Sequence, residues 1–386
     1  MPYTIRAMPL PEPSADALLA SRALASVIRD DIREHHDWIP FARFMELALY
    51  AKDLGYYAGG STKLGKEGDF TTAPEITPLF GETIARFAVD SFGAEPLTVL
   101  EFGAGTGRLA RDVLQSLERQ GVTVREYLIV ELSTELRDRQ REMLAGFAQV
   151  RWLSVPPLAF SGLILANEVL DAMPVHLLVK QRNRWLERGV SISGERFIFQ
   201  DREADPALAD QIVGERSLPE GYLTEVHPRQ CAFVRMLADL LVSGGRGLAL
   251  LIDYGFPARE YYLAQRELGT LMCHYRHHAH TDPFYLPGLQ DITAHVDFTA
   301  MALAAQEAGL TVAAYMSQAE FLIAAGLTEL LTQTSPEEAR NWLTQSQAIQ
   351  KLTSPAEMGE LFKVLLLSQA MDLPEHLLRF DRSYRL

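Results

Sequence analysis

The stretch Val99-Leu-Glu-Phe-Gly-Ala-Gly-Thr-Gly-Arg108 decides the fold, because a short apolar run breaks there into three glycines at alternate positions. Residues 99–102 read as a buried parallel strand, and residues 109–117 place apolar side chains at helical spacing behind the turn. Glycines are needed between them because the backbone must turn sharply and approach a ligand that no Cβ blocks. The stretch therefore predicts a nucleotide-binding turn between a strand and a helix.

The spacing of the glycines narrows the class of ligand. A dinucleotide fingerprint, Gly-x-Gly-x-x-Gly, would end one residue further on, where this chain has Arg108 instead of glycine. The observed form, Glu-x-Gly-x-Gly-x-Gly ending at Gly107, resembles motif I of the S-adenosylmethionine-dependent methyltransferases. A purely structural glycine-rich turn remains the alternative, so the rest of the chain must decide.

Length, charge and cysteine content limit the classes of function that we expect for this chain. A chain of 386 residues is long for one compact core, so one domain with large insertions or two domains is expected. No run of eighteen apolar residues and no secretory signal is present, and two cysteines are too few for a disulfide framework, which favours a reducing cytoplasm. A net charge of -14 opposes binding to phosphate backbones. We therefore expect no membrane span, no nucleic acid, and a basic protein or cationic small molecule as substrate.

Seven segments read as strands of one mostly parallel sheet. They alternate with helical patterns, which is typical of an α/β fold. The predicted strands are residues 99–102, 127–131, 149–153, 162–166, 248–253, 311–315 and 362–368. Residues 182–200 alternate like a hairpin and form an insertion between the fourth and fifth of these strands.

The amino-terminal part is predicted to be helical and to end in a lid. Residues 14–50 carry apolar side chains at helical intervals, interrupted by Pro40. Thr72 is a plausible helix cap before Pro74 in the first turn, and we expect Asp69, Thr71 and Thr72 to reach a cofactor from this segment. A simple turn with a helix cap is the alternative.

Acidic side chains follow two of the predicted strands. Glu131 ends the second strand, about twenty residues beyond Gly107, where a carboxylate accepts bonds from both ribose hydroxyls. Asn167, Glu168 and Asp171 follow the fourth strand, at the sheet edge where open parallel sheets bind ligands. Glu168 and Asp171 lie three apart and share a face if a helical turn begins there.

A histidine-rich segment between residues 274 and 280 is a weaker candidate for chemistry. It contains no helix-spaced pair of histidines with a carboxylate partner, and no pair of cysteines supports a thiolate site. We therefore predict no metal site in this chain.

Taken together, these stretches resemble the MidA-like family of methyltransferases, whose eukaryotic members are mitochondrial complex I assembly factors. The resemblance spans nearly the whole chain, and the order and spacing of its motifs are specific. The matching segments are Gly55-Tyr-Tyr57 and residues 68–76, 80–82, 101–107, 130–133, 166–176, 252–255, 291–298 and 355–363. One departure is Ala51, where the family pattern has a proline.

The resemblance implies a Rossmann-like, seven-stranded class I methyltransferase sheet with an N-terminal helical extension and inserted helical and hairpin elements. We expect residues 1–92 to form the extension and cofactor lid, and residues 93–386 the core, with insertions at about 180–228, 256–296 and 318–354. The relatives imply S-adenosyl-L-methionine as cofactor and an arginine of a complex I subunit as methyl acceptor. A homodimer is compatible with the sequence, and the eukaryotic relatives act in the mitochondrial matrix.

Methyl transfer to a guanidinium nitrogen needs carboxylates that orient the planar cation and balance its charge. Two alternatives remain: a non-catalytic assembly factor that keeps the cofactor fold, and a methyltransferase for a small molecule. We predict catalysis by Glu168 and Asp171, and cofactor contacts from Asp69, Thr71, Thr72, Pro74, Glu101, Gly103, Ala104, Gly105, Gly107, Glu131, Leu132, Asn167 and Glu168.

Overall fold

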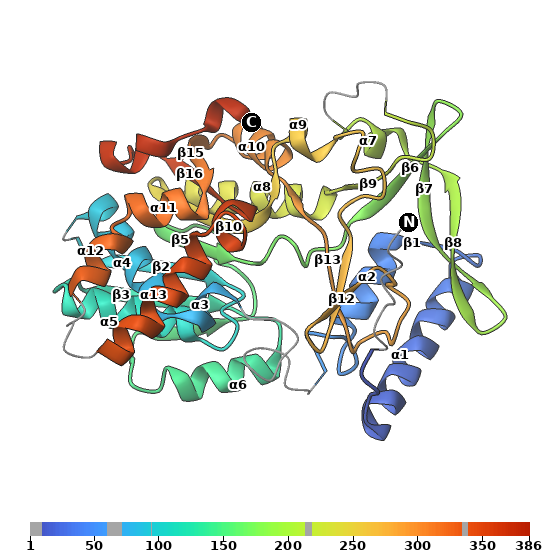
Figure 1. Ribbon diagram of the computed structural model, residues 1–386, viewed down its shortest axis with the longest axis horizontal. Helices are drawn as coiled ribbons and strands as arrows, with labels where there is room; N and C mark the ends of the chain where they lie inside the picture. Colours follow the sequence, from blue (N-terminus) through green and yellow to red (C-terminus); the bar gives the residue numbers. More distant parts are fainter. Residues whose placement is uncertain (1–9, 60–71, 94, 213–217, 334–338) are drawn as a thin grey trace.

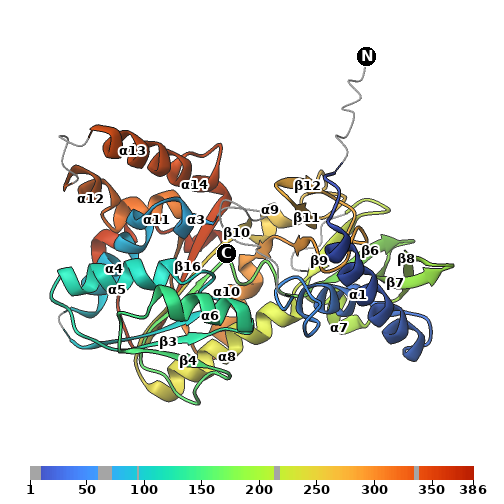
Figure 2. The ribbon, with the colours of Figure 1, turned by 90° about the horizontal axis from the view of Figure 1, so that it is seen from below.

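The computed structural model describes residues 10–59, 72–93, 95–212, 218–333 and 339–386. Two lobes lie side by side: a larger α/β lobe, and a smaller lobe that combines the first two helices with the long hairpin (Figure 1). A view turned by 90° separates the same two groups of elements (Figure 2). The site described below lies between them.

The larger lobe is built on one twisted sheet whose strand order is β15-β16-β10-β5-β2-β3-β4, with β14 (Val296–Asp297) paired to the end of β10. Neighbours from β10 to β4 run parallel, whereas β16 is antiparallel to both of its neighbours. The strands are β2 (Leu97–Phe102), β3 (Val124–Val130), β4 (Val150–Leu153), β5 (Gly162–Asn167), β10 (Gly247–Phe256), β15 (Thr311–Ser317) and β16 (Phe362–Gln369). All seven predicted strands are present, and the predicted Rossmann-like α/β fold is confirmed.

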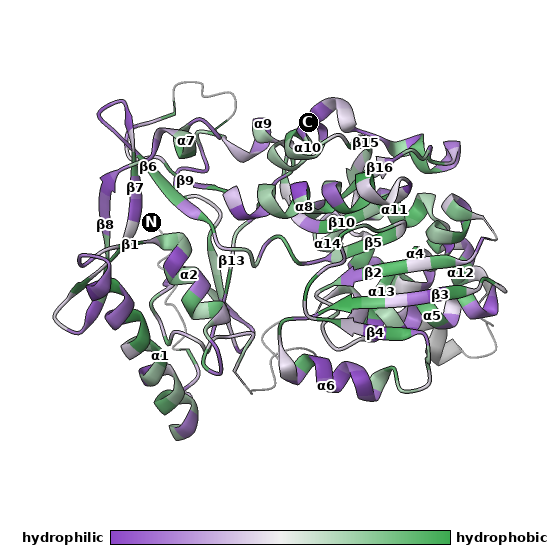
Figure 3. Ribbon diagram, turned by 180° about the vertical axis from the view of Figure 1, so that it is seen from behind, coloured by the Kyte–Doolittle hydropathy of each residue, from purple (hydrophilic) through white to green (hydrophobic). Residues whose placement is uncertain are grey.

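The central strands are apolar on both faces because helices cover both. In β5, Leu163 and Leu165 pack into one core while Ile164 and Ala166 pack into the other, as the two-residue period of a strand requires. Figure 3 shows these strands as mostly hydrophobic. The first face packs against α4 (Pro78–Phe92), α5 (Arg108–Arg119), α11 (Gln318–Ala324), α12 (Leu327–Gln333), α13 (Ala339–Thr353) and α14 (Met358–Leu361), and the second against α8 (Pro228–Gly244) and α10 (Phe298–Glu307).

The smaller lobe has its own core. Buried side chains of α1 (Ala15–Glu34) and α2 (Phe41–Tyr50) pack there against strands inserted between β5 and β10. The predicted hairpin is present as β7 (Arg184–Ser193) and β8 (Arg196–Glu203). The sheet of this lobe is completed by β1 (Ile39–Pro40), β6 (His176–Gln181) and β9 (Leu223–Val226), and a three-stranded sheet of β11 (Met272–Tyr275), β12 (His278–His280) and β13 (Asp291–Thr293) packs beside it.

The remaining elements are the other helices of the chain. They are α3 (Ala73–Ile76), α6 (Thr134–Met143), α7 (Pro206–Ala209), α9 (Ala258–Tyr261), η1 (Glu375–Phe380) and η2 (Ser383–Arg385). Thr72 is the N-cap of α3 and Pro74 lies in its first turn, as predicted, although the side chain of Thr72 makes no capping bond. The helix α4 has a separate cap, Thr77, whose side chain accepts the N–H of Leu79.

The loop that follows β5 joins the two lobes. The hydroxyl of Tyr50, from α2, donates to the carbonyl of Ala172 at 2.9 Å. The N–H of Ala294, just beyond β13, donates to the carbonyl of Asp171 at 3.0 Å. Because the smaller lobe contacts this loop from two elements, it fixes the backbone that carries the candidate catalytic residues.

We expect Gly162→Ala to lower the free energy of unfolding by about 3 kcal/mol, through left-handed strain combined with a backbone clash. Gly162 starts β5 at φ +141°, and a Cβ there would lie 2.2 Å from the carbonyl oxygen of Thr98. Urea denaturation of Gly146→Ala is the control, because a Cβ at Gly146 meets no atom within 4 Å. Equal stability of the two variants would contradict the tight pairing of β2 with β5.

Candidate active site

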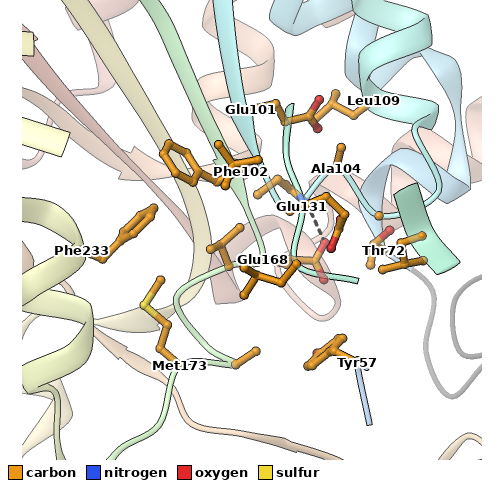
Figure 4. Close-up of a pocket in the computed structure, with 18 of the residues that line it drawn as sticks. Tyr57, Thr72, Glu101, Phe102, Ala104, Leu109, Glu131, Glu168, Met173 and Phe233 are labelled. Carbon is orange, nitrogen blue, oxygen red and sulfur yellow. Dashed lines mark hydrogen bonds between the residues drawn. The ribbon is translucent and has the colours of Figure 1, made fainter. Parts of the chain in front are cut away.

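A cavity of about 530 Å³ opens at the carboxyl ends of β2, β3 and β5, between the two lobes. Most of its wall is apolar, and a few polar groups converge on it, which is the usual composition of a small-molecule site. Figure 4 shows side chains from both lobes directed toward it. Of the predicted site residues, the wall contains Thr72, Pro74, Glu101, Gly103, Ala104, Gly105, Glu131, Leu132, Asn167 and Glu168.

The glycine turn between β2 and α5 forms one side of the cavity. All three glycines have a positive φ: +65° at Gly103, +54° at Gly105 and +86° at Gly107. Gly103 and Gly105 line the cavity, but Gly107 is not among the lining residues. Gly107 is the N-cap of α5, and a Cβ there would lie 3.4 Å from Gln140. That distance is an ordinary contact, so the structure favours glycine here for its left-handed backbone at the start of the helix.

Glu131 lies directly after β3 with its carboxylate held on both oxygens. The N–H of Ser133 donates to Oε1, and Nε2 of Gln140 donates to Oε2, each at 2.9 Å. Burial raises the pKa of this carboxyl, and these hydrogen bonds oppose the shift. Each carboxylate oxygen has a second lone pair, so Glu131 retains acceptor capacity for two hydroxyls of a ligand.

Gln140 ties three strand ends together. Besides its bond to Glu131, its Nε2 donates to the carbonyl of Gly105 at 2.9 Å, and its Oε1 accepts the indole N–H of Trp152 at 2.9 Å. Because Gly105 follows β2, Glu131 follows β3 and Trp152 belongs to β4, one fully buried amide sets their relative positions.

Glu101 is the acidic residue of β2, next to its carboxyl end, and it is almost fully buried. The hydroxyl of Tyr127 donates to its Oε2 at 2.6 Å. Burial raises the pKa of Glu101 to about 7, the bond from Tyr127 lowers it, and the nearby charge of Glu131 raises it. Glu101 lies at the cavity wall, and the raised pKa makes its neutral form more accessible than that of an ordinary glutamate.

The short helix α3 closes the cavity over the glycine turn. The hydroxyl of Thr106 donates to Glu75 at 2.5 Å, and Nε of Arg108 lies 3.3 Å from the other oxygen of Glu75. Thr72, labelled in Figure 4, lines the cavity at this point together with Pro74. The two other residues predicted for the lid, Asp69 and Thr71, lie outside the described residues.

Glu168 lies near the middle of the site (Figure 4). Its backbone has φ +53°, an uncommon value for a non-glycine residue and one that recurs at functional sites. Nδ2 of Asn167 donates to its Oε1 at 3.0 Å, and the N–H of Ala73 donates to the same carboxyl. Burial, followed by the charge of Asp171, raises its pKa to about 8. Oδ1 of Asn167 is buried with no partner in the described residues, so the pair offers an unused acceptor beside the cavity.

Asp171 is close to Glu168 but is not among the residues that line the cavity. Its Oδ2 accepts the hydroxyl of Tyr254 at 2.5 Å, and burial raises its pKa to about 6. No helix begins after β5, so the expected helical face shared by Glu168 and Asp171 is wrong. Oδ2 of Asp253 accepts the N–H of Leu170 at 2.9 Å and that of Asp171 at 3.2 Å, so the backbone of this loop is held by a side chain of β10.

Sequence reasoning missed the contribution of the smaller lobe to the cavity. Tyr50, Tyr57 and Glu46 line it from the smaller lobe, and Arg229 pairs with Glu46 at 3.5 Å. Gly55-Tyr-Tyr57 was recognised as a family segment, but no pattern in the sequence connects it to a strand end 110 residues away. The cavity wall also contains unpredicted apolar residues, among them Phe102, Val169, Met173, Phe233 and Met236.

The residues present match an adenosyl cofactor rather than a metal. Within the described ranges, no group of three or more His, Cys, Asp and Glu residues could hold a metal ion. The carboxylate of Glu131, with spare lone pairs, suits ribose hydroxyls, and the unpaired Oδ1 of Asn167 suits an ammonium donor. In the same described part of the chain, no helix is long and apolar enough to cross a membrane.

Comparisons with known proteins agree with this geometry. A model of a family described as putative S-adenosyl-L-methionine-dependent methyltransferases matches residues 83–316. A crystal structure of a likely methyltransferase from Burkholderia thailandensis, bound to S-adenosyl-homocysteine, has 48% sequence identity and a TM-score of 0.93, covering 98% of this chain and 100% of that one.

Curated relatives extend the comparison to animals. A mitochondrial protein arginine methyltransferase, the NDUFAF7 homolog of Drosophila melanogaster, is 30% identical over 403 residues, which is 92% of this chain and 87% of that protein. NDUFAF7 of Danio rerio, also a mitochondrial protein arginine methyltransferase, is 28% identical over 84% of this chain and 82% of its own length.

We expect Gly105→Val to weaken binding of S-adenosyl-homocysteine at least about 100-fold, because the branched side chain would enter the cavity and strain the turn. Isothermal calorimetry measures the affinity. Gly121→Val is the matched control, since Gly121 has φ +71° and a Cβ there meets no atom within 4 Å. Unchanged affinity in Gly105→Val would remove this turn from the ligand site.

A second prediction concerns stability against pH. The pKa of Glu168 is raised from 4.5 to about 8, so its contribution to stability is full below about pH 4.5 and is lost as pH rises through 8. Glutamine cannot ionise, so Glu168→Gln should gain stability relative to wild type between pH 5 and pH 8.5 in urea denaturation. Glu126→Gln, at an exposed position, should show no such trend. A stability difference that stays constant with pH would refute the raised pKa.

Proposed function

Since this chain belongs to the family of putative S-adenosyl-L-methionine-dependent methyltransferases, we propose that it methylates a guanidinium nitrogen of arginine in a protein. The observation that carries the proposal is Glu168, a carboxyl directed into the cavity with no cationic partner among the described residues. The named activity of the animal relatives supports the same choice of acceptor.

S-adenosyl-L-methionine supplies an electrophilic methyl group carried on a cationic sulfonium. The residues that would hold it are Gly103 and Gly105, by close backbone approach, and Glu131, through the ribose hydroxyls. Thr72, Pro74, Glu101, Ala104, Leu132 and Asn167 line the same cavity and complete the proposed cofactor contacts. We retain Asp69 and Thr71 in this proposal from the sequence alone.

Glu168 would orient the acceptor. A guanidinium is planar and presents parallel N–H groups, which a carboxylate accepts in pairs. Glu168 is fixed for this task on its far side by Asn167 and by the N–H of Ala73. Positioning a nitrogen in line with the methyl group is the main catalytic requirement of such a displacement.

Glu168 would also accept the proton. Methylation replaces one N–H bond by an N–C bond, so one proton leaves while the guanidinium remains cationic. A carboxyl whose pKa is raised to about 8 is a stronger base than an ordinary glutamate. Asp171 lies behind Glu168, bonded to Tyr254, and we propose that it acts through its charge rather than by touching the acceptor.

Two other functions remain distinct alternatives. A non-catalytic assembly factor would have no use for an unpaired acid beside the methyl donor, and a small-molecule enzyme would have no use for an acceptor opening bordered by a second lobe. We place the reaction in the cytoplasm, on a protein substrate and without nucleic acid, and leave a homodimer as a proposal.

The experiment uses radiolabelled cofactor and peptides whose only cation is arginine, lysine or the terminal amine. We expect label on arginine peptides, located by tandem mass spectrometry, and segments of respiratory complex I are the first acceptors to test. Label on lysine or on small amines would replace the proposed acceptor. Cofactor binding without transfer to any peptide would favour the non-catalytic alternative.

We expect Glu168→Gln to lower turnover by about two orders of magnitude or more, with the dissociation constant of S-adenosyl-homocysteine nearly unchanged. Wild-type kcat/KM should rise with pH and level off near pH 8, because the ionised carboxylate is the active form. Glu126→Gln is the control for loss of one surface charge. Full turnover in Glu168→Gln would leave Asp171 or Asp253 as the carboxylate to test.

A further inference from the structure

Two tyrosines of the smaller lobe form a stacked pair at the cavity. Tyr50 ends α2, and Tyr57 follows seven residues later in a turn. Their ring centroids lie 5.5 Å apart with an interplanar angle of 21°, and both side chains line the cavity. Figure 4 shows Glu168 between the glycine turn and the ring of Tyr57. The pair therefore lies on the other side of Glu168 from the glycine turn.

Both phenol groups are bonded away from the cavity. The hydroxyl of Tyr50 donates to the carbonyl of Ala172 at 2.9 Å, and that of Tyr57 donates to Oδ1 of Asp291 at 3.0 Å. Burial raises the pKa of each phenol, so both rings stay neutral. With the polar ends engaged, the rings offer the cavity an aromatic surface rather than a hydroxyl.

The charges around the cavity favour the binding of a cation beside Glu168. The two arginines of the cavity wall are already paired, Arg108 with Glu75 and Arg229 with Glu46. Glu168 has no such partner among the described residues, and Asp171 and Asp291 add negative charge behind it. A ligand that is both cationic and flat would satisfy the carboxylate and the aromatic surface together.

We propose that Tyr50 and Tyr57, with Glu168, form a recognition site that selects a guanidinium over an ammonium group, a proposal that rests on the function proposed above. The carboxylate would accept N–H groups at the edge of the guanidinium while the tyrosine pair stacks against its face. A lysine ammonium is compact and strongly hydrated, and it has no planar face to stack.

The smaller lobe supplies the tyrosine pair, so the proposed recognition site needs residues of both lobes. Asp291, from β13, fixes the hydroxyl of Tyr57, and the loop after β5 fixes that of Tyr50. Asp291 is thus a positioning residue for the tyrosine pair. The insertion that contains β13 would contribute to acceptor choice without touching the acceptor.

The test compares Tyr57→Leu with Tyr57→Phe, using arginine peptides and matched lysine peptides. Tyr57→Leu removes the aromatic surface, and we expect KM for the arginine peptide to rise about tenfold to thirtyfold. Tyr57→Phe keeps the ring and should stay within about threefold of wild type. Tyr222→Leu is the matched control, because Tyr222 is a buried tyrosine whose hydroxyl donates to the carbonyl of Leu263, away from the cavity wall.

A measurement on the unmodified protein covers the case in which Tyr57→Leu fails to fold. Methylguanidinium should inhibit competitively with the peptide at a concentration at least about tenfold below that of methylammonium. Equal inhibition by both ions would overturn the proposal, as would an unchanged KM in Tyr57→Leu or, in a Tyr57→Leu variant that is folded by circular dichroism, loss of S-adenosyl-homocysteine binding. If wild type transfers no methyl group to arginine, the proposed function itself fails, which separates the two failures.

Discussion

The carboxylate of Asp253 holds the backbone on which the site depends. At the end of β10 it accepts the N–H groups of Leu170 and Asp171 through one oxygen and that of Tyr254 through the other. Two of these bonds fix the backbone just beyond Glu168, whose side chain lines the cavity. Burial and the charges of Asp171 and Glu168 raise the pKa of Asp253, so this arrangement works against its ionisation. The backbone donors offset part of that cost.

The fold was predictable from the sequence because its signals are local. The apolar run before Gly103 and the helical spacing after Gly107 are sufficient to define the first strand, turn and helix, and the same patterns identify the other strands of the sheet. The helix start at Thr72 and Pro74 was predictable in the same way, whereas the second cap at Thr77, which begins α4, was not part of the sequence-based prediction.

The candidate site was predictable where it follows strand ends and not where it depends on distant contacts. Glu131 and Glu168 line the cavity because parallel strands end at one edge of the sheet. Asp171 seemed equivalent by spacing, but the bonds from Asp253 to the loop set its side chain behind the wall. Tyr50 and Tyr57 reach the cavity only through the packing of the smaller lobe, which has no signature in a short window of sequence.

The side chain that can occupy position 140 is limited by hydrogen-bond donors and acceptors and not only by volume. The amide nitrogen of Gln140 donates to a carbonyl and to a carboxylate, while its oxygen accepts from the indole of Trp152. A glutamate has nearly the same shape, yet it would set an acceptor against two acceptors and add a second negative charge beside Glu131. Substitution at this position is therefore restricted by the direction of three hydrogen bonds. A mostly polar helix thus contains one fully buried residue whose side chain is fixed by its hydrogen-bond partners.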